Sequence, residues 1–396
     1  MPRFEPFPGI RYDLTRVALG DVVSPPYDVI DDSQRAGLAA RSPYNAVRVD
    51  LPVDEGGEDR YTVARHLFAR WQADGVLVLD RRPTFTLYRM SYADDAGVDR
   101  HTTGVIGALD LSRPGADILP HEQTTPKARS DRLELLRACR ANLSAIWGLS
   151  LAKGLTDLLP VDAAPVADVD DGEGVRHTVW IVDEPDVSDA IAAAVAAQPV
   201  VIADGHHRYE TSLAYQSERE RSEGQAGGAA ATLAFVVELV EDELTVRAIH
   251  RLLNGLPPGF DVVAALDPWF EPAGPPPAEM PLTAAMAEAG ALCAVLPTGE
   301  VMLRPRPDAL AESRDLDSAR LDVALAALPP HEVTFQHGPD NVRRAVASGE
   351  AQAGVLLRPA SVAQIEATAH GGERMPPKTT FFHPKPKTGL VFRDLA

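Results

Sequence analysis

Five consecutive residues place a carboxylate, two imidazoles and a guanidinium around one glycine: Asp204, Gly205, His206, His207 and Arg208. Side chains of these types, combined with the free backbone N–H groups of a helix start, bind anions such as phosphate. Asp204 also offers an oxygen ligand for a divalent cation such as Mg²⁺. The alternative is purely structural: Asp204 caps a helix, Gly205 makes a turn, and the remaining side chains are solvated.

The segments on either side of this group indicate how it is positioned. Residues 199–203 form a short apolar run rich in β-branched side chains, which predicts a buried strand. A helical pattern begins at His206 and ends in a charged segment near Glu220. A strand, a tight glycine turn and a helix together direct N–H groups and the positive end of the helix dipole at the turn. The sequence therefore predicts an anion site at residues 204–208.

Two other segments present polar side chains on irregular backbone. In the run Ser24-Pro25-Pro26-Tyr27-Asp28 the prolines exclude a helix, so we expect Tyr27 and Asp28 to form a pocket wall. His121 and Glu122 lie with Lys127 in an irregular segment between a predicted strand and a predicted helix. Loops held by rigid elements often carry catalytic residues. The alternative for this segment is a solvated polar loop.

Lysine is rare in this sequence and occurs only at Lys127, Lys153, Lys378, Lys385 and Lys387. Where arginine is the default cation, a retained lysine suggests a partner that requires a compact point charge, and phosphate is one such partner. Phenylalanines flank the C-terminal lysines, which predicts that the tail is packed and that Lys378 and Thr379 form an anion clamp. The alternative is that a short tail simply varies.

Composition disfavours several classes of partner. The chain has 396 residues, 45% of them hydrophobic, and a formal net charge of −19. This charge disfavours nucleic acid and anionic membranes as partners, and no apolar run approaches the length of a membrane span. The N-terminus lacks a signal-peptide pattern, and two cysteines form neither a metal site nor a disulfide framework. We expect a cytoplasmic protein.

The remaining patterns predict an α+β fold with mixed sheets and flanking helices. Helices are predicted at residues 58–74 and 131–142, and strands at residues 84–92 and 102–111 read as an antiparallel pair. Residues 45–52 alternate as a half-buried strand would.

Prolines interrupt residues 254–281, which gives the best internal boundary. We predict one domain at residues 1–254 and an α+β lobe at residues 255–396, whose tail packs back toward the first domain.

Four motifs in order give the chain an end-to-end resemblance to the bacterial and archaeal domain of unknown function 1015 family. They are Ser24-Pro25-Pro26-Tyr27-Asp28, His121-Glu122, Ala203-Asp204-Gly205-His206-His207-Arg208-Tyr209-Glu210-Thr211 and Met375-Pro376-Pro377-Lys378-Thr379-Thr380-Phe381. The third also resembles a motif of the wider ParB/sulfiredoxin-like superfamily, which includes free-serine kinases. That resemblance implies a nucleotide-binding core with phosphates at this turn. Sulfiredoxin has a cysteine in this region where this chain has His206 and His207, so sulfiredoxin chemistry is disfavoured.

The leading hypothesis is a nucleotide-dependent phosphotransferase that acts on a small hydroxylated metabolite, similar to free-serine kinase. ATP or ADP, with CTP as a further possibility, would be bound with Mg²⁺ at residues 204–208, and Asp204 would cap the turn or ligate the metal. Glu122 is the preferred base, Asp28 the second candidate, and His121 a third candidate catalytic residue. A Walker motif is missing, which excludes the P-loop class. The alternatives are a non-catalytic nucleotide-binding switch of ParB-like type and, least favoured, a ParB-like nuclease.

Replacement of Glu122 by glutamine separates an enzyme from a switch. If Glu122 takes the acceptor's proton, Glu122→Gln should lower turnover by about 10²–10⁴-fold and leave nucleotide affinity unchanged. A residue at a helix entry or in a surface ion pair would instead cost about 1 kcal/mol of stability or less, with turnover retained. Turnover, nucleotide affinity and melting temperature are measured on the same variant. Turnover within about threefold of wild type removes Glu122 from the mechanism.

Overall fold

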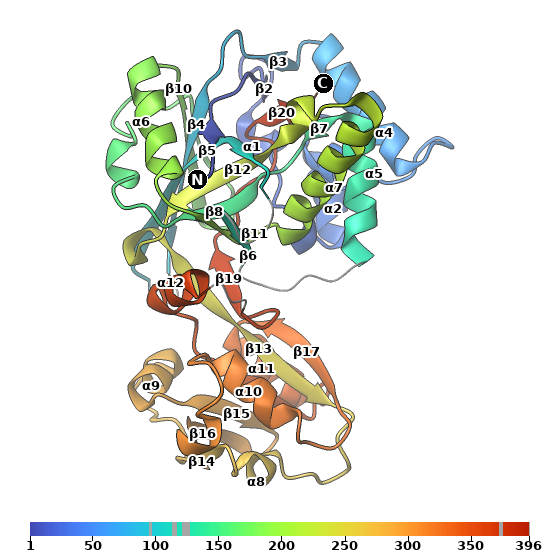
Figure 1. The fold of residues 1–396 in the computed structure, drawn as a ribbon. Coiled ribbons are helices and arrows are strands. Elements are labelled where there is room, and N and C mark those ends of the chain that lie inside the picture. The colour runs from blue at the N-terminus through green and yellow to red at the C-terminus, as the bar shows by residue number, and fades with distance from the viewer. Residues whose placement is uncertain (95–96, 113–116, 121–126, 372–374, 396) are drawn as a thin grey trace. The chain divides into compact units, whose positions relative to one another are not determined.

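The computed structural model describes residues 1–94, 97–112, 117–120, 127–371 and 375–395 (Figure 1). The chain divides into two compact units. Unit 1 comprises Met1–Thr245 together with Pro384–Ala396, and unit 2 comprises Val246–His383. The C-terminal tail is therefore part of unit 1. The division into domains at residue 254 stays a prediction.

Unit 1 is built on a large mixed sheet, which has nine strands in the described part of the chain. Across the sheet these are β6 (Ile118–Pro120), β11 (Val200–Asp204), β8 (Ile146–Ser150), β12 (Ala231–Glu238), β5 (Asp99–Asp110), β4 (Phe85–Ala93), β10 (Val175–Val182) and β9 (Ala167–Asp170), with β1 (Phe4–Glu5) paired to β5. A smaller sheet has the order β3 (Leu77–Leu79), β2 (Gly9–Tyr12), β20 (Phe392–Asp394), β7 (Ala141–Asn142).

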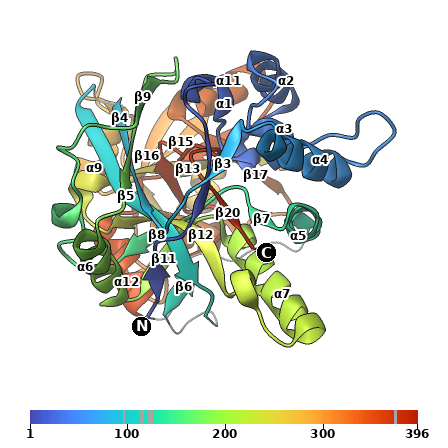
Figure 2. The same cartoon turned by 90° about the horizontal axis from the view of Figure 1, so that it is seen from above.

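Helices cover both sides of the large sheet. The helices of unit 1 are α1 (Leu19–Val22), α2 (Asp32–Arg41), α3 (Val47–Asp50), α4 (Arg60–Ala73), α5 (Lys127–Cys139), α6 (Pro185–Ala196) and α7 (His206–Glu223). Figure 2 shows α6 on one side of the sheet and the neighbouring helices α5 and α7 on the other. Ile191 and Val195 of α6 belong to the core that also contains Leu87, Val105 and Val236 of the strands. Burial of this apolar surface is the main force that holds the layers together.

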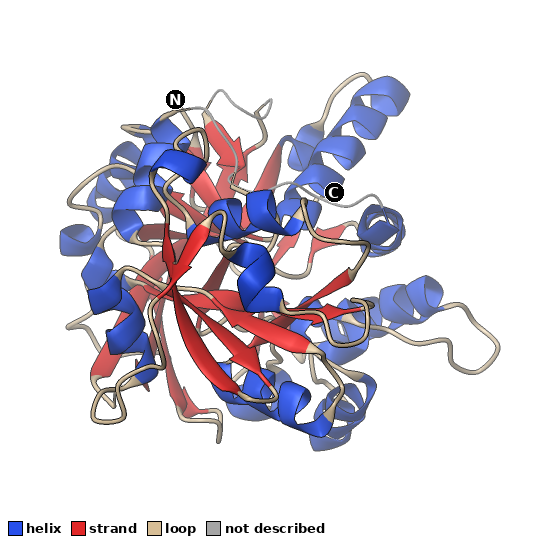
Figure 3. Cartoon of the chain, turned by 90° about the horizontal axis from the view of Figure 1, so that it is seen from below, coloured by secondary structure: helices blue, strands red, loops and turns tan. Residues whose placement is uncertain are grey.

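Unit 2 has its own sheet and its own hydrophobic core. Its strands run in the order β14 (Phe270–Pro272), β16 (Gly299–Pro305), β15 (Leu292–Leu296), β18 (Ala353–Leu356), β13 (Thr245–Asn254) and β17 (Glu332–His337), with β19 (Thr380–His383) paired to β13. Its helices are α8 (Val262–Leu266), α9 (Leu282–Ala289), α10 (Asp317–Leu325), α11 (Pro339–Ser348) and α12 (Val362–His370). Helices and strands occur together in the chain (Figure 3), and the large sheet of unit 1 has parallel and antiparallel pairs, which confirms the predicted α+β class with mixed sheets.

Several predicted elements are confirmed and two need correction. The helix predicted at residues 58–74 is α4, and the predicted antiparallel pair is β4 with β5. The helix predicted at residues 131–142 instead spans α5, because Ala141 and Asn142 form a strand that pairs with β20.

The prediction of a strand at residues 45–52 is wrong, because Val47–Asp50 is the helix α3. The Oδ1 atom of Asn45 accepts a hydrogen bond from the N–H of Val47 at 3.0 Å, and its Nδ2 group donates to the carbonyl of Asp21 at 2.8 Å. Asparagine side chains that bond to nearby backbone favour turns and helix starts over strands. The apolar alternation is real, but it lies on one short helical turn that is buried on several sides.

Candidate functional site

The predicted strand, turn and helix around Asp204 are confirmed. Residues 200–203 of β11 are buried, Gly205 has a φ of +87°, and α7 begins at His206. A φ in this range is adopted readily by glycine and is costly for residues that carry a Cβ atom. Gly205 is itself the residue that precedes the helix, and in the described part of the chain no side chain caps it. The structural alternative in which Asp204 caps α7 is therefore wrong.

The carboxylate of Asp204 instead pairs with two cations from different parts of the chain. Its Oδ2 atom lies 2.7 Å from Nη2 of Arg208, one turn along α7. Its Oδ1 atom is bonded to Nζ of Lys385, which comes from the C-terminal tail. Burial alone would raise the pKa of the Asp204 carboxyl, but the Lys385 ammonium and the Arg208 guanidinium outweigh it and hold that pKa well below its usual range.

Arg208 is buried with only part of its hydrogen-bonding capacity used. Its Nη1 group donates to the carbonyl of Ala145, and Nη2 donates to Asp204. Among the described residues, nothing accepts a hydrogen bond from its Nε–H group. A Cβ atom added at Gly205 would lie 3.0 Å from this Nε atom, so the guanidinium packs closely against the glycine and leaves no room for a side chain there. A buried donor without a partner calls for an explanation, and a bound anion supplies one.

Tyr27 and Asp28 are brought to this arginine by the proline-rich loop. The Tyr27 ring lies between two guanidinium groups, 4.1 Å from that of Arg132 and 5.9 Å from that of Arg208. Burial raises the pKa of Tyr27 to about 12. Burial also lowers the pKa of Arg208, but the charges of Asp204 and Asp28 outweigh it and raise that pKa overall. The prediction that Tyr27 and Asp28 form a pocket wall stays a prediction; in this structure both lie near Arg208.

A buried carboxylate that the sequence reasoning missed lies next to these groups. Asp50 is 2% exposed, and its Oδ1 atom lies 3.6 Å from Nη1 of Arg132 and 3.2 Å from Oγ of Ser144. Burial raises the pKa of Asp50 against the opposing charge of Arg132. Asp50 was missed because it ends the helix α3, which the sequence pattern predicted to be a strand. Lys385 had one signal in the sequence, which was the rarity of lysine.

The other predicted site residues are placed as follows. His206 and His207 are half-buried in the first turn of α7. Lys378 and Thr379 belong to unit 2, where Nη1 of Arg251 donates to the Lys378 carbonyl at 3.0 Å and the Thr379 hydroxyl lies 2.8 Å from that of Ser318.

His121 and Glu122 lie outside the described residues. The last described residue before them is Pro120, at the end of β6. It lies opposite Ile202 in the parallel pairing of β6 with β11. Within the described ranges, no group of three or more His, Cys, Asp or Glu side chains could hold a metal ion. No helix there is long and apolar enough to cross a membrane.

Residues 4–324 match the family model described as "Protein of unknown function (DUF1015)". The chain belongs to this family. The family resemblance drawn from the four motifs is thereby confirmed. No curated protein matches the chain.

Solved structures that are similar to this chain share little sequence with it. A conserved hypothetical protein from Pyrococcus furiosus is 12% identical, with a TM-score of 0.37, over 74% of this chain and 95% of its own. A free serine kinase in complex with AMP is 15% identical, with a TM-score of 0.36, over 73% of this chain and 91% of its own. A C-terminally truncated SbnI from Staphylococcus aureus is 15% identical, with a TM-score of 0.38, over 73% and 87%. Similarity at this level carries no argument about activity.

Removal of the Asp204 charge should destabilise the fold in a pH-dependent way. Asp204→Asn leaves Arg208 and Lys385 buried without their counter-ion, and we expect a loss of about 3–5 kcal/mol in the free energy of unfolding at pH 7. The pKa of Asp204 is lower in the folded protein than the ~3.9 of an unfolded chain, so its contribution is present above about pH 4 and is lost as the pH falls toward the folded value. Denaturant titrations at pH 7, 5 and 3 should therefore show the difference shrinking only in the most acidic buffer.

The matched control is Asp183→Asn, which removes a carboxylate from an exposed pair with Arg82. We expect it to cost about 1 kcal/mol or less. An equally small loss for Asp204→Asn at pH 7 would contradict the assignment of Asp204 as the counter-ion of this site.

Proposed function

We propose that this protein binds a nucleotide through its phosphates at the Asp204–Arg208 turn and transfers a phosphoryl group to a small hydroxylated metabolite. One observation carries the proposal. At the start of an 18-residue helix, against a left-handed glycine, lies a buried arginine whose Nε–H group has no partner among the described residues. Phosphoryl transfer requires positioned phosphates, neutralised charge and a base near the acceptor, more than covalent chemistry from the protein.

The phosphates would be held by backbone and side-chain donors together. The first N–H groups of α7 have no acceptor within their own helix, and they face the turn together with the positive end of the helix dipole. Asp204 pairs with both Arg208 and Lys385, so two cations lie together at this turn. A phosphate that accepts from both would make charge-assisted hydrogen bonds with them.

Mg²⁺ fits this arrangement through Asp204. Magnesium sites in nucleotide enzymes use one or two carboxylates, with waters and the phosphates themselves as the other ligands. A single carboxylate beside the proposed phosphate site is enough for such a centre, and Asp204 would serve once the phosphates take over its two cations. Bound there, the metal would neutralise charge on the phosphates.

The acceptor's proton requires a carboxylate base in the same region. Asp28 is exposed, and its charge contributes to raising the pKa of Arg208, which supports Asp28 as a base near the proposed phosphate. Glu122 remains the first candidate from the sequence and His121 its neighbour. The assignments of Lys378 and Thr379 to phosphate binding also remain predictions. A non-catalytic switch would bind nucleotide at the same turn without forming a phosphorylated acceptor, so product analysis separates the two.

The nucleotide should depend on Arg208 for its affinity. Arg208→Ala removes a charged hydrogen-bond donor, and we expect binding of ADP or ATP with Mg²⁺ to weaken by about 1.5–3 kcal/mol, which is roughly 10–150-fold. Isothermal titration calorimetry measures the affinity, and a melting curve checks that the variant is folded.

The control for this variant is Arg221→Ala, in the exposed last turn of the same helix, where Nε bonds only to the carbonyl of Ser217. It should bind as wild type does. If wild type has no measurable affinity for ATP, ADP or CTP with Mg²⁺, the proposal that phosphates bind at the Asp204–Arg208 turn is wrong.

A further inference from the structure

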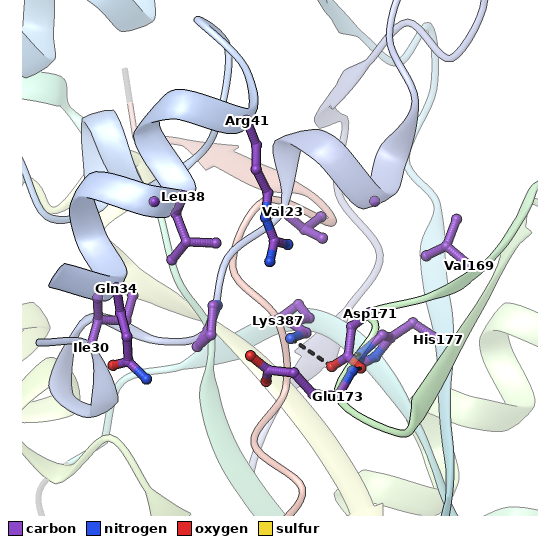
Figure 4. Close-up of a pocket in the computed structure, with 13 residues that line it drawn as sticks. Val23, Ile30, Gln34, Leu38, Arg41, Val169, Asp171, Glu173, His177 and Lys387 are labelled. Carbon is purple, nitrogen blue, oxygen red and sulfur yellow. Dashed lines mark hydrogen bonds and ion pairs between the residues drawn. The ribbon is translucent and has the colours of Figure 1, made fainter.

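A second region of unit 1 forms a cavity of about 210 Å³ that the proposed nucleotide site does not use. Helix α2 and the proline-rich loop form one side, and the turn between β9 and β10 forms the other (Figure 4). Apolar side chains contribute Val23, Ile30, Leu38 and Val169 to its lining. Pockets for drug-sized ligands have volumes of about 300–1,000 Å³, so this cavity suits a smaller metabolite rather than a nucleotide.

The floor of the cavity is a fixed chain of polar groups. Nζ of Lys387 lies 2.9 Å from Oδ2 of Asp171, and Nε2 of His177 lies 3.1 Å from the same oxygen. The hydroxyl of Tyr88 lies 2.7 Å from Nδ1 of His177. The Oδ1 atom of Asp171 accepts N–H bonds from Glu173 at 2.8 Å and from Val175 at 3.1 Å. These bonds hold the Lys387 ammonium at the cavity with two of its three N–H donors left over.

The polar groups on the floor of the cavity carry no net charge. Burial lowers the pKa of His177 to about 4, so this imidazole is neutral near pH 7. Burial would raise the pKa of Asp171, but hydrogen bonds from Lys387 and from backbone N–H groups lower it, so this carboxylate is ionised. The Lys387–Asp171 pair therefore has no net charge. Recognition of a charged ligand then depends on the groups at the mouth.

Two oppositely charged side chains, Arg41 and Glu173, line the open side of the cavity and have no partners among the described residues. Arg41 in the last turn of α2 and Glu173 in the turn before β10 are both exposed. Among the described residues, neither side chain makes a hydrogen bond or an ion pair, and Figure 4 shows both directed into the space between them. A guanidinium and a carboxylate that face one cavity from different elements, beside an apolar wall, match a molecule with both charges and an apolar body.

We propose that this cavity binds a small zwitterion of the α-amino acid class with an apolar side chain. The ligand carboxylate would accept from Arg41 and from the free donors of Lys387. Its ammonium would donate to Glu173, and its side chain would pack on Val23, Leu38 and Val169. The site is separate from the proposed nucleotide turn and does not depend on it.

The test is calorimetric titration of the full chain with L-valine, L-leucine, L-isoleucine and L-methionine. We expect at least one to bind with a dissociation constant in the micromolar to millimolar range, from about 10⁻⁶ to 10⁻³ M. Arg41→Gln and Glu173→Gln should each weaken that binding by about tenfold or more. Both residues are exposed, so both variants should melt as wild type does.

Two probes related to L-valine assign the charges. Isobutylamine lacks the carboxylate, so Arg41→Gln should not affect its binding; 3-methylbutanoate lacks the ammonium, so Glu173→Gln should not affect its binding. The matched control is Arg70→Gln, an exposed arginine in the last turn of α4, which should leave every affinity unchanged.

Failure of this site is distinguishable from failure of the nucleotide site. ADP affinity should be the same in Arg41→Gln as in wild type. The proposal is overturned if none of the four amino acids binds, or if Arg41→Gln binds them within about twofold of wild type.

Discussion

The candidate site depends on one carboxylate, with a side chain that is 15% exposed, that pairs with two cations. Asp204 ends the strand β11, Arg208 lies in the first turns of α7, and Lys385 comes from the tail. Buried charges are tolerated only when they are paired and hydrogen-bonded, so these three groups fix one another's positions. The result joins a strand, a helix and a distant segment at one point. The Nε–H group of Arg208 has no partner among the described residues, and it lies near a helix start, which is why we propose that an anion binds at this place.

The tail connects this point with the second cavity. Lys385 and Lys387 are two residues apart, and they reach different carboxylates, Asp204 and Asp171. Thr388 then forms a pair of backbone hydrogen bonds with Ser24 of the proline-rich loop, at 2.8 and 3.1 Å. This pairing holds the C-terminal tail against the proline-rich loop, and both segments contribute residues to the Asp204 turn and to the second cavity. Both lysines of this short run therefore form ion pairs in the structure, whereas the composition could only suggest that they had a role.

Features that depend on residues close in the sequence were predictable, and features that depend on distant residues were not. The β11–turn–α7 unit is local, so β-branched residues, one glycine and a helical pattern were sufficient to predict it. The same segment contains the side chains that we propose bind an anion. The role of Lys385 was not predictable, because its partner lies 181 residues away in the sequence. Asp50 was missed because a four-residue helix with a buried apolar side mimics the alternation of a strand. The pocket at Arg41 and Glu173 requires three separate segments to meet, and no local pattern encodes that.

Amide hydrogen exchange at the turn tests the central claim most directly. Exchange is followed by mass spectrometry across peptides that contain residues 204–210, with and without ADP and Mg²⁺, and compared with peptides from the exposed end of α7. Phosphates bound by the first N–H groups of the helix should slow exchange in the turn peptides and leave the others unchanged. Unchanged exchange at the turn, at ADP concentrations that saturate binding, would contradict the account.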